Sequence, residues 1–182
     1  MIRIYHRFKV LSVVFILSMM QVSVAQAQTC VNKIPKTTPA TDFTVHNDGT
    51  VTHNPTGLMW KVCSEGQTWQ SSDGSCSGTA TTHNWSQALQ VPQALNSQSG
   101  FADYRDWRLP KFKELASIAE LACHSPAINT TIFNDAPSTF YWSASPSANN
   151  SYGAWGVYFG YGERGYVSRS HANLVRLVRS GQ

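Results

Sequence analysis

The strongest pattern of apolar and polar positions lies between Tyr104 and Ala122. Large apolar side chains at Tyr104, Trp107 and Leu109 indicate a short strand. Pro110 follows, and its fixed φ suits the first position of a helix. Beyond it, apolar residues recur at helical spacing, at Phe112, Leu115, Ile118 or Ala119, and Ala122. We therefore predict a helix from Pro110 towards Ala122 that presents one apolar face to a sheet.

Alternating positions before this stretch predict a β-meander. Residues 43–45 alternate apolar and polar side chains, and the Asn-Asp-Gly sequence at 47–49 is a turn signal. Val51 begins the return strand, and the apolar run 58–62 predicts a third strand. Residues 64–84 are polar and lack periodicity, so we expect a long loop that is either functional or held by a disulfide.

A second helix and several more strands are predicted around the central stretch. Asn84 can cap a helix with an apolar face, and Pro92 should kink or shorten it. Residues 123–139 are expected to be irregular. The remaining strands are expected at 140–143, 154–159, 166–168 and 174–179. The last of them should place Arg176 and Leu177 on opposite faces. The pattern as a whole predicts an α+β fold with two helices and several short strands.

Composition agrees with one domain that has a substantial core. The chain has 182 residues, of which 12% are aromatic, and its 13% charged residues are about half the usual share. These values suggest a sheet-rich, extracellular domain. Four large side chains are expected to anchor the core, namely Trp60, Trp107, Leu115 and Trp142.

The N-terminus has the pattern of a signal peptide over residues 1–27. Basic residues precede an apolar run at 10–20, and Ala25-Gln26-Ala27 resembles a cleavage site. The alternatives are an uncleaved anchor, for which the run is short, and a lipoprotein at Cys30, which its preceding residues disfavour. We expect a secreted, periplasmic or cell-surface protein with no membrane span after cleavage. Residues 28–41 would then be a leader, loose apart from Cys30, and 42–182 the domain.

Cleavage would also change the charge of the working protein. Three of the 14 Lys and Arg residues lie in residues 1–27, whereas none of the 10 Asp and Glu residues do. The mature chain would therefore carry 11 basic and 10 acidic groups, a net charge of +1. This balance does not favour nucleic acid as a partner.

The four cysteines predict two disulfides, because an even number in an exported chain is typical of a disulfide framework. Three pairings can be drawn. We favour Cys63–Cys76, which closes a local Gly/Ser-rich loop, and Cys30–Cys123, which joins the N-terminus to the end of the central helix. A reactive thiol or a metal site is the less favoured alternative, since the chain has no CxxC motif.

Neither a catalytic site nor a metal site is predicted, and we expect no cofactor. Glu114 and Glu120 are six residues apart in the predicted helix and would not face each other. The histidines are scattered along the chain, without the spacing of metal ligands. Residues 73–74 and 134–135 are weak candidates for contact with Ca²⁺.

The C-terminal third contains the best candidates for ligand binding. Four arginines lie there against the single acid Glu163, namely Arg164, Arg169, Arg176 and Arg179. We expect Arg164 and Arg169 to contact anionic groups, and Tyr152 or Tyr161, in Gly/Asn-rich loops, to stack on sugar rings. We expect Trp142, Trp155 and Phe159 to belong to the core, and Arg176 and Arg179 to be structural. For Arg164, in a turn predicted at 161–165, and for Arg169 the alternative is that they pair with carboxylates or are solvated.

Three motifs and a closing segment stand in an order that resembles a known family. They are Thr56-Gly57-Leu58-Met59-Trp60, Trp107-Arg108-Leu109-Pro110 with Glu114-Leu115, Tyr141-Trp142-Ser143-Ala144-Ser145, and Val175-Arg176-Leu177-Val178-Arg179. Together they resemble the Lcl C-terminal domain family over residues 42–180. This family of exported bacterial domains is named after a collagen-like adhesin.

The resemblance carries expectations about fold and function. The adhesin binds sulfated glycosaminoglycans as a trimer, but this chain has no Gly-X-Y region, which leaves its oligomeric state open. More distantly, the motifs resemble the formylglycine-generating-enzyme branch of C-type-lectin-like folds. That likeness implies two helices beside small sheets, paired chain ends and long loops on one side. The enzyme uses cysteines near its C-terminus, and residues 166–182 contain none, so its activity is not implied.

These observations favour a disulfide-stapled, C-type-lectin-like domain without enzymatic activity. Its expected ligand is an anionic, sulfated polysaccharide or another cell-surface ligand, as for an adhesin. The alternative is a structural component of a bacterial envelope or surface assembly that is recognised by another surface protein.

Overall fold

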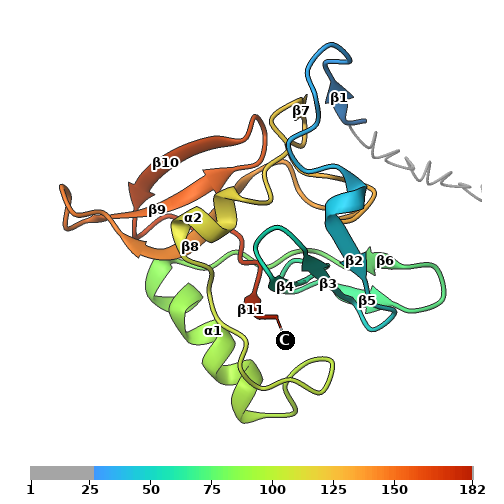
Figure 1. Ribbon diagram of the computed structural model, residues 1–182. Coiled ribbons are helices and arrows are strands. Elements are labelled where there is room, and N and C mark those ends of the chain that lie inside the picture. The colour runs from blue at the N-terminus through green and yellow to red at the C-terminus, as the bar shows by residue number, and fades with distance from the viewer. Residues whose placement is uncertain (1–26, 182) are drawn as a thin grey trace, which may run out of the picture.

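Four small antiparallel sheets and two α-helices form the part of the chain that the computed structural model describes, residues 27–181 (Figure 1). The predicted signal peptide lies outside these residues, except for its last position. Between residues 27 and 181, neither helix combines the length and apolar character that a membrane crossing needs.

A four-stranded sheet joins the beginning of the domain to its end. Its strands, in spatial order, are β11 (Val178–Ser180), β4 (Leu58–Lys61), β3 (Thr50–His53) and β2 (Phe43–Val45). The predicted meander is therefore confirmed. The terminal strand is shorter than predicted: the Leu177 carbonyl still accepts from Lys61 of β4, but residues before it bond outside the ladder. The Val175 carbonyl accepts from the backbone N–H of Glu65, for example.

A three-stranded sheet carries the aromatic part of the chain. Its strands are β8 (Phe140–Pro146), β9 (Gly153–Tyr158) and β10 (Glu163–Ser168), with β9 in the middle. Helix α2 (Phe112–Ala116) packs on one face, where Phe112 contacts Trp155, and α1 (Trp85–Ser97) contacts β8 (Figure 1). The indole of Trp85 donates a hydrogen bond to the Ser143 carbonyl.

Two small sheets carry the disulfides. Strands β1 (Thr29–Cys30) and β7 (Cys123–His124) pair directly, and Cys30 is bonded to Cys123. Strands β5 (Thr68–Gln70) and β6 (Ser75–Ser77) form a hairpin, and Cys76 of β6 is bonded to Cys63. The prediction of two disulfides is confirmed with the favoured pairing, but residues 64–84 are not a plain loop. Short polar strands of this kind have no apolar periodicity to reveal them.

Helix α1 begins as predicted but does not end at its proline. Asn84 and Gln87 form a capping box, in which each side chain accepts from the other residue's backbone N–H. Pro92 lies inside the helix, which continues to Ser97. The buried pyrrolidine ring packs in the interior, and this burial offsets the backbone hydrogen bond that proline removes.

The central helix is much shorter than predicted. Helix α2 ends at Ala116, and the predicted strand before it is an extended segment with isolated bridges such as Arg108 to Val178. Beyond Ala116 the chain makes tertiary bonds instead of helical ones: Ala119 bridges Ile128, and the Glu120 N–H bonds to the Ala127 carbonyl. Apolar spacing predicts which residues are buried, but not that partners distant in sequence interrupt the helix.

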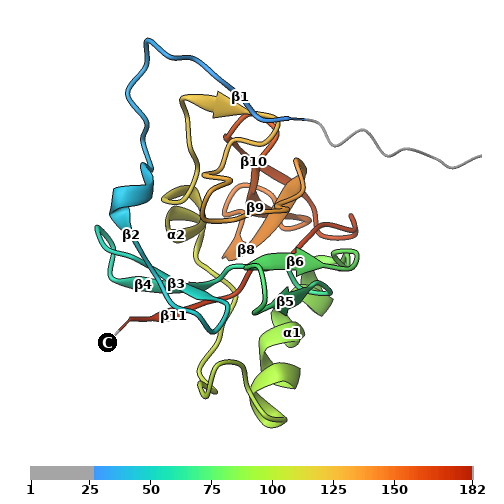
Figure 2. The ribbon, with the colours of Figure 1, turned by 90° about the vertical axis from the view of Figure 1, so that its right-hand side faces the viewer.

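Glu120 fixes the N-terminal leader to the domain. Its buried carboxylate accepts hydrogen bonds from the backbone N–H groups of Thr37, Thr38 and Ala122, and from both threonine hydroxyls. The expectation of a loose leader is therefore wrong. Figure 2 shows this segment running from β1 to the 3₁₀ helix η1 (Ala40–Asp42) and β2 along one side of the molecule.

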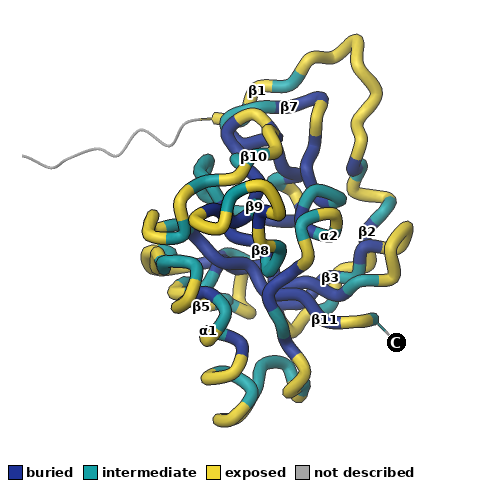
Figure 3. Tube along the Cα trace, turned by 90° about the vertical axis from the view of Figure 1, so that its left-hand side faces the viewer, coloured by how far each residue is buried: buried dark blue, intermediate teal, exposed yellow. Residues whose placement is uncertain are grey.

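The large apolar side chains form two clusters on either side of the three-stranded sheet. Trp60 and Leu115 lie in one cluster, and Trp107 and Trp142 in the other; all four are buried, as expected. Figure 3 shows the buried parts of the chain in dark blue at the centre of the molecule. Leu177 joins the second cluster. The class of small antiparallel sheets, two helices and two disulfides is thus confirmed, whereas likeness to C-type lectins remains a prediction.

We predict that Leu115→Ala destabilises the domain by about 2–5 kcal/mol, because it leaves a cavity at a fully buried site. Chemical denaturation measures this difference. Leu121→Ala is the matched control, since Leu121 is 53% exposed and its truncation should change stability by about 0.5 kcal/mol at most. Equal effects of the two substitutions would contradict the assigned core.

A second prediction concerns the pH dependence of stability at Glu120. Burial alone raises the pKa of Glu120, but hydrogen bonds from Thr37, Thr38 and Ala122 outweigh it and hold the pKa below its ordinary value. The carboxylate therefore stabilises the fold fully above its unfolded pKa of about 4.3, and this contribution is lost as the pH falls through the lower folded value. Glu120→Gln should cost about 1–3 kcal/mol near neutral pH.

Urea unfolding of wild type and Glu120→Gln across the acidic range tests this expectation. The difference between their free energies of unfolding should shrink as wild type is acidified below about pH 4.3. A difference that stays constant with pH would show that the charge of Glu120 is not what holds the leader.

Candidate functional site

The structure separates the two tyrosines expected to form one sugar platform. Tyr152 and Tyr161 are exposed, at 80% and 59%, but they lie beyond opposite ends of β9. Six residues of strand span roughly 20 Å. Tyr161 also stacks on His124, with ring centroids 5.8 Å apart. The two tyrosines therefore do not face one sugar ring, and each needs partners of its own.

Arg169 has a role inside the fold. Its guanidinium lies 4.4 Å from the ring centre of Trp85, and its Nε donates to the Gly153 carbonyl at 3.1 Å. The backbone N–H of Arg169 also donates to the Tyr152 carbonyl. These contacts tie the segment after β10 to the start of β9 and to α1. We therefore assign Arg169 a structural role and exclude it from the candidate site.

Arg164 lies in β10, although a turn was predicted there. It is exposed and pairs with Val157 of β9. Because side chains alternate along a strand, Arg164 points to the face of the sheet on which α2 packs, and Glu163 points away. Arg164 and Lys113 of α2 line the same pocket, of about 280 Å³.

A row of aromatic rings continues from this pocket along the same face. Phe112 lies 5.2 Å from Trp155, and Trp155 lies 5.4 Å from Tyr166, between ring centroids. A second pocket, of about 380 Å³, is lined by Phe112, Trp155, Pro146 and two lysines of α2 and its N-cap. We define the α2 surface as Lys111, Phe112, Lys113, Trp155, Arg164 and Tyr166.

The α2 surface carries unpaired positive charge. Among residues 27–181, Lys111, Lys113 and Arg164 have no carboxylate oxygen within 4.0 Å. The neighbouring acid Glu114 is held by Arg108 at 2.7 and 2.9 Å. Burial raises the pKa of Glu114, but hydrogen bonds from Arg108 and the Lys111 N–H outweigh it, so the pKa lies below its usual value. Glu114 is therefore negatively charged and forms its ion pair with Arg108, although Lys111 is close enough to contribute to the lowered pKa.

Sequence reasoning placed one member of the α2 surface in the site and missed the rest. Arg164 was expected, whereas Trp155 was assigned to the core and Lys111 and Lys113 to the polar side of a long helix. The Lys-Phe-Lys sequence before an apolar helix was the available signal. It could not show that β10 lies beside α2.

The described part of the chain offers little for metal binding. Between residues 27 and 181, His, Cys, Asp and Glu side chains do not gather in groups of three that could hold a metal ion. The two weak Ca²⁺ candidates do come together, since the Asn134 amide donates to the Gly74 carbonyl. Asp135, however, accepts the backbone N–H of Cys76 at 3.2 Å.

Comparison with models of protein families identifies the family of the chain. The model of the family described as Lcl C-terminal domain matches residues 49–179, which is more than half of the chain. This match lies within the range over which the sequence motifs resemble that family. No curated protein matches the chain.

We predict that Arg169→Ala destabilises the domain by about 1–2 kcal/mol, because it removes the contact with Trp85 and a hydrogen bond. Arg164→Ala removes the same side chain from an exposed position and should change stability by about 0.5 kcal/mol at most. Thermal and urea unfolding measure both. If the two variants were equally stable, the structural assignment of Arg169 would be incorrect.

Proposed function

Because this chain belongs to the Lcl C-terminal domain family, we propose that its adhesin-like surface domain binds an anionic, sulfated polysaccharide through the α2 surface, without catalysis. The two disulfides and the family agree with an extracellular or surface location. We also propose that the N-terminal signal directs secretion and that the ligand is sulfated.

The observation that carries the proposal is the combination of unpaired cations with half-exposed aromatic rings. Guanidinium and ammonium groups bind sulfate and carboxylate oxygens through charge-assisted hydrogen bonds. Phe112, Trp155 and Tyr166 offer ring faces and edges for the apolar side of a sugar. The expected mature chain is nearly neutral overall, so attraction for polyanions would have to come from a local group of cations. The α2 surface provides such a group.

The surroundings of the carboxylates support a binding role over a hydrolytic one. Two-carboxylate glycosidases need one free acid and one free base on either side of the bond they cleave. Here Glu114 is bound by Arg108, Asp106 by Arg179, and Glu120 by the leader. These three acids thus already have structural partners.

One observation favours the alternative of a protein partner. Val31 and Ile34 of the leader and Leu121 are each about half exposed, at 47%, 49% and 53%. Val31 and Leu121 lie close together, because the Val31 N–H bonds to the carbonyl of Ala122. Such an apolar patch on the leader could be covered in a surface assembly.

Heparin binding of the mature protein tests the proposed function. We expect Lys113→Ala with Arg164→Ala to weaken binding at least about tenfold, since each cation contributes charge-assisted hydrogen bonds. Binding should also weaken as salt rises, because exposed charges are screened over about 8–10 Å at physiological ionic strength. Calorimetry at low and moderate salt measures both effects.

Lys33→Ala with Lys36→Ala is the matched control, because it removes two exposed charges from the leader. This control should retain heparin affinity, and both double variants should keep the wild-type melting temperature. If both double variants lost the same heparin affinity, the effect would be due to net charge and not to the α2 surface. If the wild-type protein did not bind heparin at low salt, the protein-partner alternative would be favoured.

A further inference from the structure

Besides the two pockets of the α2 surface, a hollow of about 390 Å³ lies between three loops. It shares no lining residue with the α2 surface. One wall is the turn between β2 and β3, and another is the tip of the β5–β6 hairpin. The third is the segment 131–134, between β7 and β8. Only the hairpin wall belongs to residues 64–84, for which a long loop was predicted.

The floor of the hollow is apolar and includes a tryptophan. Val62 and Ile132 are buried beneath it, and Trp69 is partly exposed beside them. The ring of Trp69 lies against Gly49, whose φ is +84°; a Cβ there would come within 2.8 Å of the Trp69 Cγ. Because residue 49 is a glycine, there is room at this turn for the Trp69 ring in the floor of the hollow.

The rim is polar and carries no cation. Its polar side chains are those of Asn47, Ser71, Asp73, Thr131 and Asn134. Within residues 27–181, Asn47, Ser71 and Thr131 make no side-chain hydrogen bond to the protein, and Asp73 uses one oxygen for Ser75. Amide, hydroxyl and carboxylate groups thus surround an apolar floor, as in many sites for small polar ligands.

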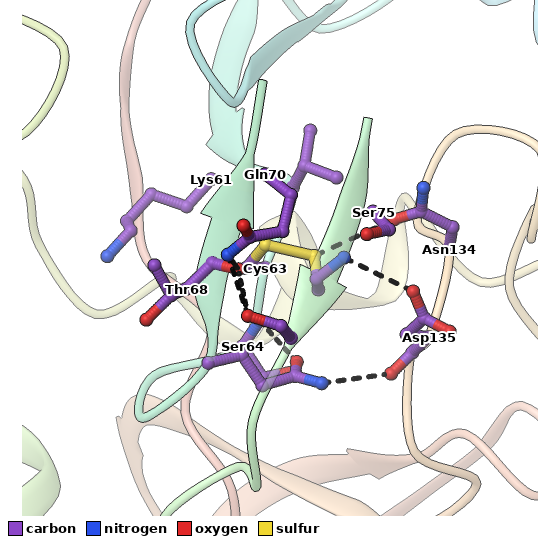
Figure 4. Close-up of a disulfide and its surroundings, with 12 residues drawn as sticks. Lys61, Cys63, Ser64, Thr68, Gln70, Ser75, Asn134 and Asp135 are labelled. Carbon is purple, nitrogen blue, oxygen red and sulfur yellow. Dashed lines mark hydrogen bonds between the residues drawn. A yellow bond between two sulfur atoms is a disulfide. The ribbon is translucent and has the colours of Figure 1, made fainter. Parts of the chain in front are cut away.

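The walls are cross-linked, so the hollow is held open. The Cys63–Cys76 disulfide joins the hairpin to the end of β4. Figure 4 shows the hairpin beside the segment of Asn134 and Asp135, with the hydrogen bond from the Cys76 N–H to the Asp135 carboxylate. The Asn134 amide also donates to the Gly74 carbonyl. The Gln67 side chain adds a bond to the Asp135 carbonyl at 3.3 Å. A site whose walls are already fixed loses little entropy on binding.

We infer that this hollow binds one neutral pyranose ring of a glycan. The C–H face of the sugar would lie on Trp69, and its hydroxyls would donate to Asp73 and exchange hydrogen bonds with Asn47 and Thr131. Because the rim carries a carboxylate and no cation, sulfated or carboxylated sugars are disfavoured here. The inference goes beyond the proposed function and does not depend on it.

Saturation-transfer NMR and tryptophan fluorescence of the mature protein test the inference. The probes are methyl glucoside, methyl galactoside, methyl mannoside and N-acetylglucosamine. We expect at least one to bind at millimolar concentration, independently of salt. Asn47→Ala with Thr131→Val should weaken that binding about tenfold by removing rim hydrogen bonds. Both side chains are exposed, so the variant should keep its melting temperature.

The α2-surface variant Lys113→Ala with Arg164→Ala is the control and should bind the neutral sugar as wild type does. The inference is overturned if none of the four probes binds, if the rim variant binds as well as wild type, or if the site takes Ca²⁺ from calcium chloride and no sugar. Sugar binding without heparin binding would reject only the proposed function, and heparin binding without sugar binding would reject only this inference.

Discussion

The guanidinium of Arg176 lies fully buried and donates hydrogen bonds to the main-chain carbonyls of Lys61 and Val62 and to the Ser64 hydroxyl. It also lies 4.8 Å from the ring centre of Phe133. Among the described residues, no carboxylate oxygen comes within 4.0 Å of it, and burial lowers the pKa of Arg176. A buried charge is costly unless it is solvated by other groups, so carbonyl dipoles and aromatic rings must take the place of water.

This interaction connects the parts of the molecule that carry the two candidate sites. Ser64 hydrogen-bonds to the hydroxyl of Tyr141 at 2.7 Å, and Tyr141 belongs to β8 in the sheet beneath the α2 surface. Lys61 ends β4, and the chain then leads through Val62 and Cys63 to the β5–β6 hairpin, a wall of the hollow. One guanidinium therefore positions both the sheet and the hairpin, and the two sites should keep a fixed relative orientation.

The two surfaces differ in charge, and this difference separates their chemistry. The α2 surface combines three cations with aromatic rings, whereas the rim of the hollow has amides, hydroxyls and one carboxylate. A polysaccharide with both sulfated and neutral units could contact the two surfaces at once. Simultaneous contact raises avidity only when the spacing of the units matches that of the sites. The leader, held by Glu120 and the Cys30–Cys123 disulfide, belongs to the same folded body.

The sequence by itself determined the local features of this protein. Alternation identified the meander and Asn84 identified the start of α1, because both depend on neighbours along the chain. The even number of cysteines identified two disulfides, although Cys30 and Cys123 lie 93 residues apart. The buried positions of Trp107 and Leu115 also followed from spacing alone. The family motifs then indicated the class of domain.

The tertiary structure decided the features that depend on distant partners. The helix predicted from Pro110 ends at Ala116 because residues near 127 and in the leader take over its hydrogen bonds. Arg169 leaves the candidate site because Trp85, far away in sequence, lies beneath it. Lys113 and Trp155 enter the site because α2 packs on β9. The spacing of apolar residues along a chain predicts which side chains are buried. The contacts between them depend on how the sheets and helices pack together.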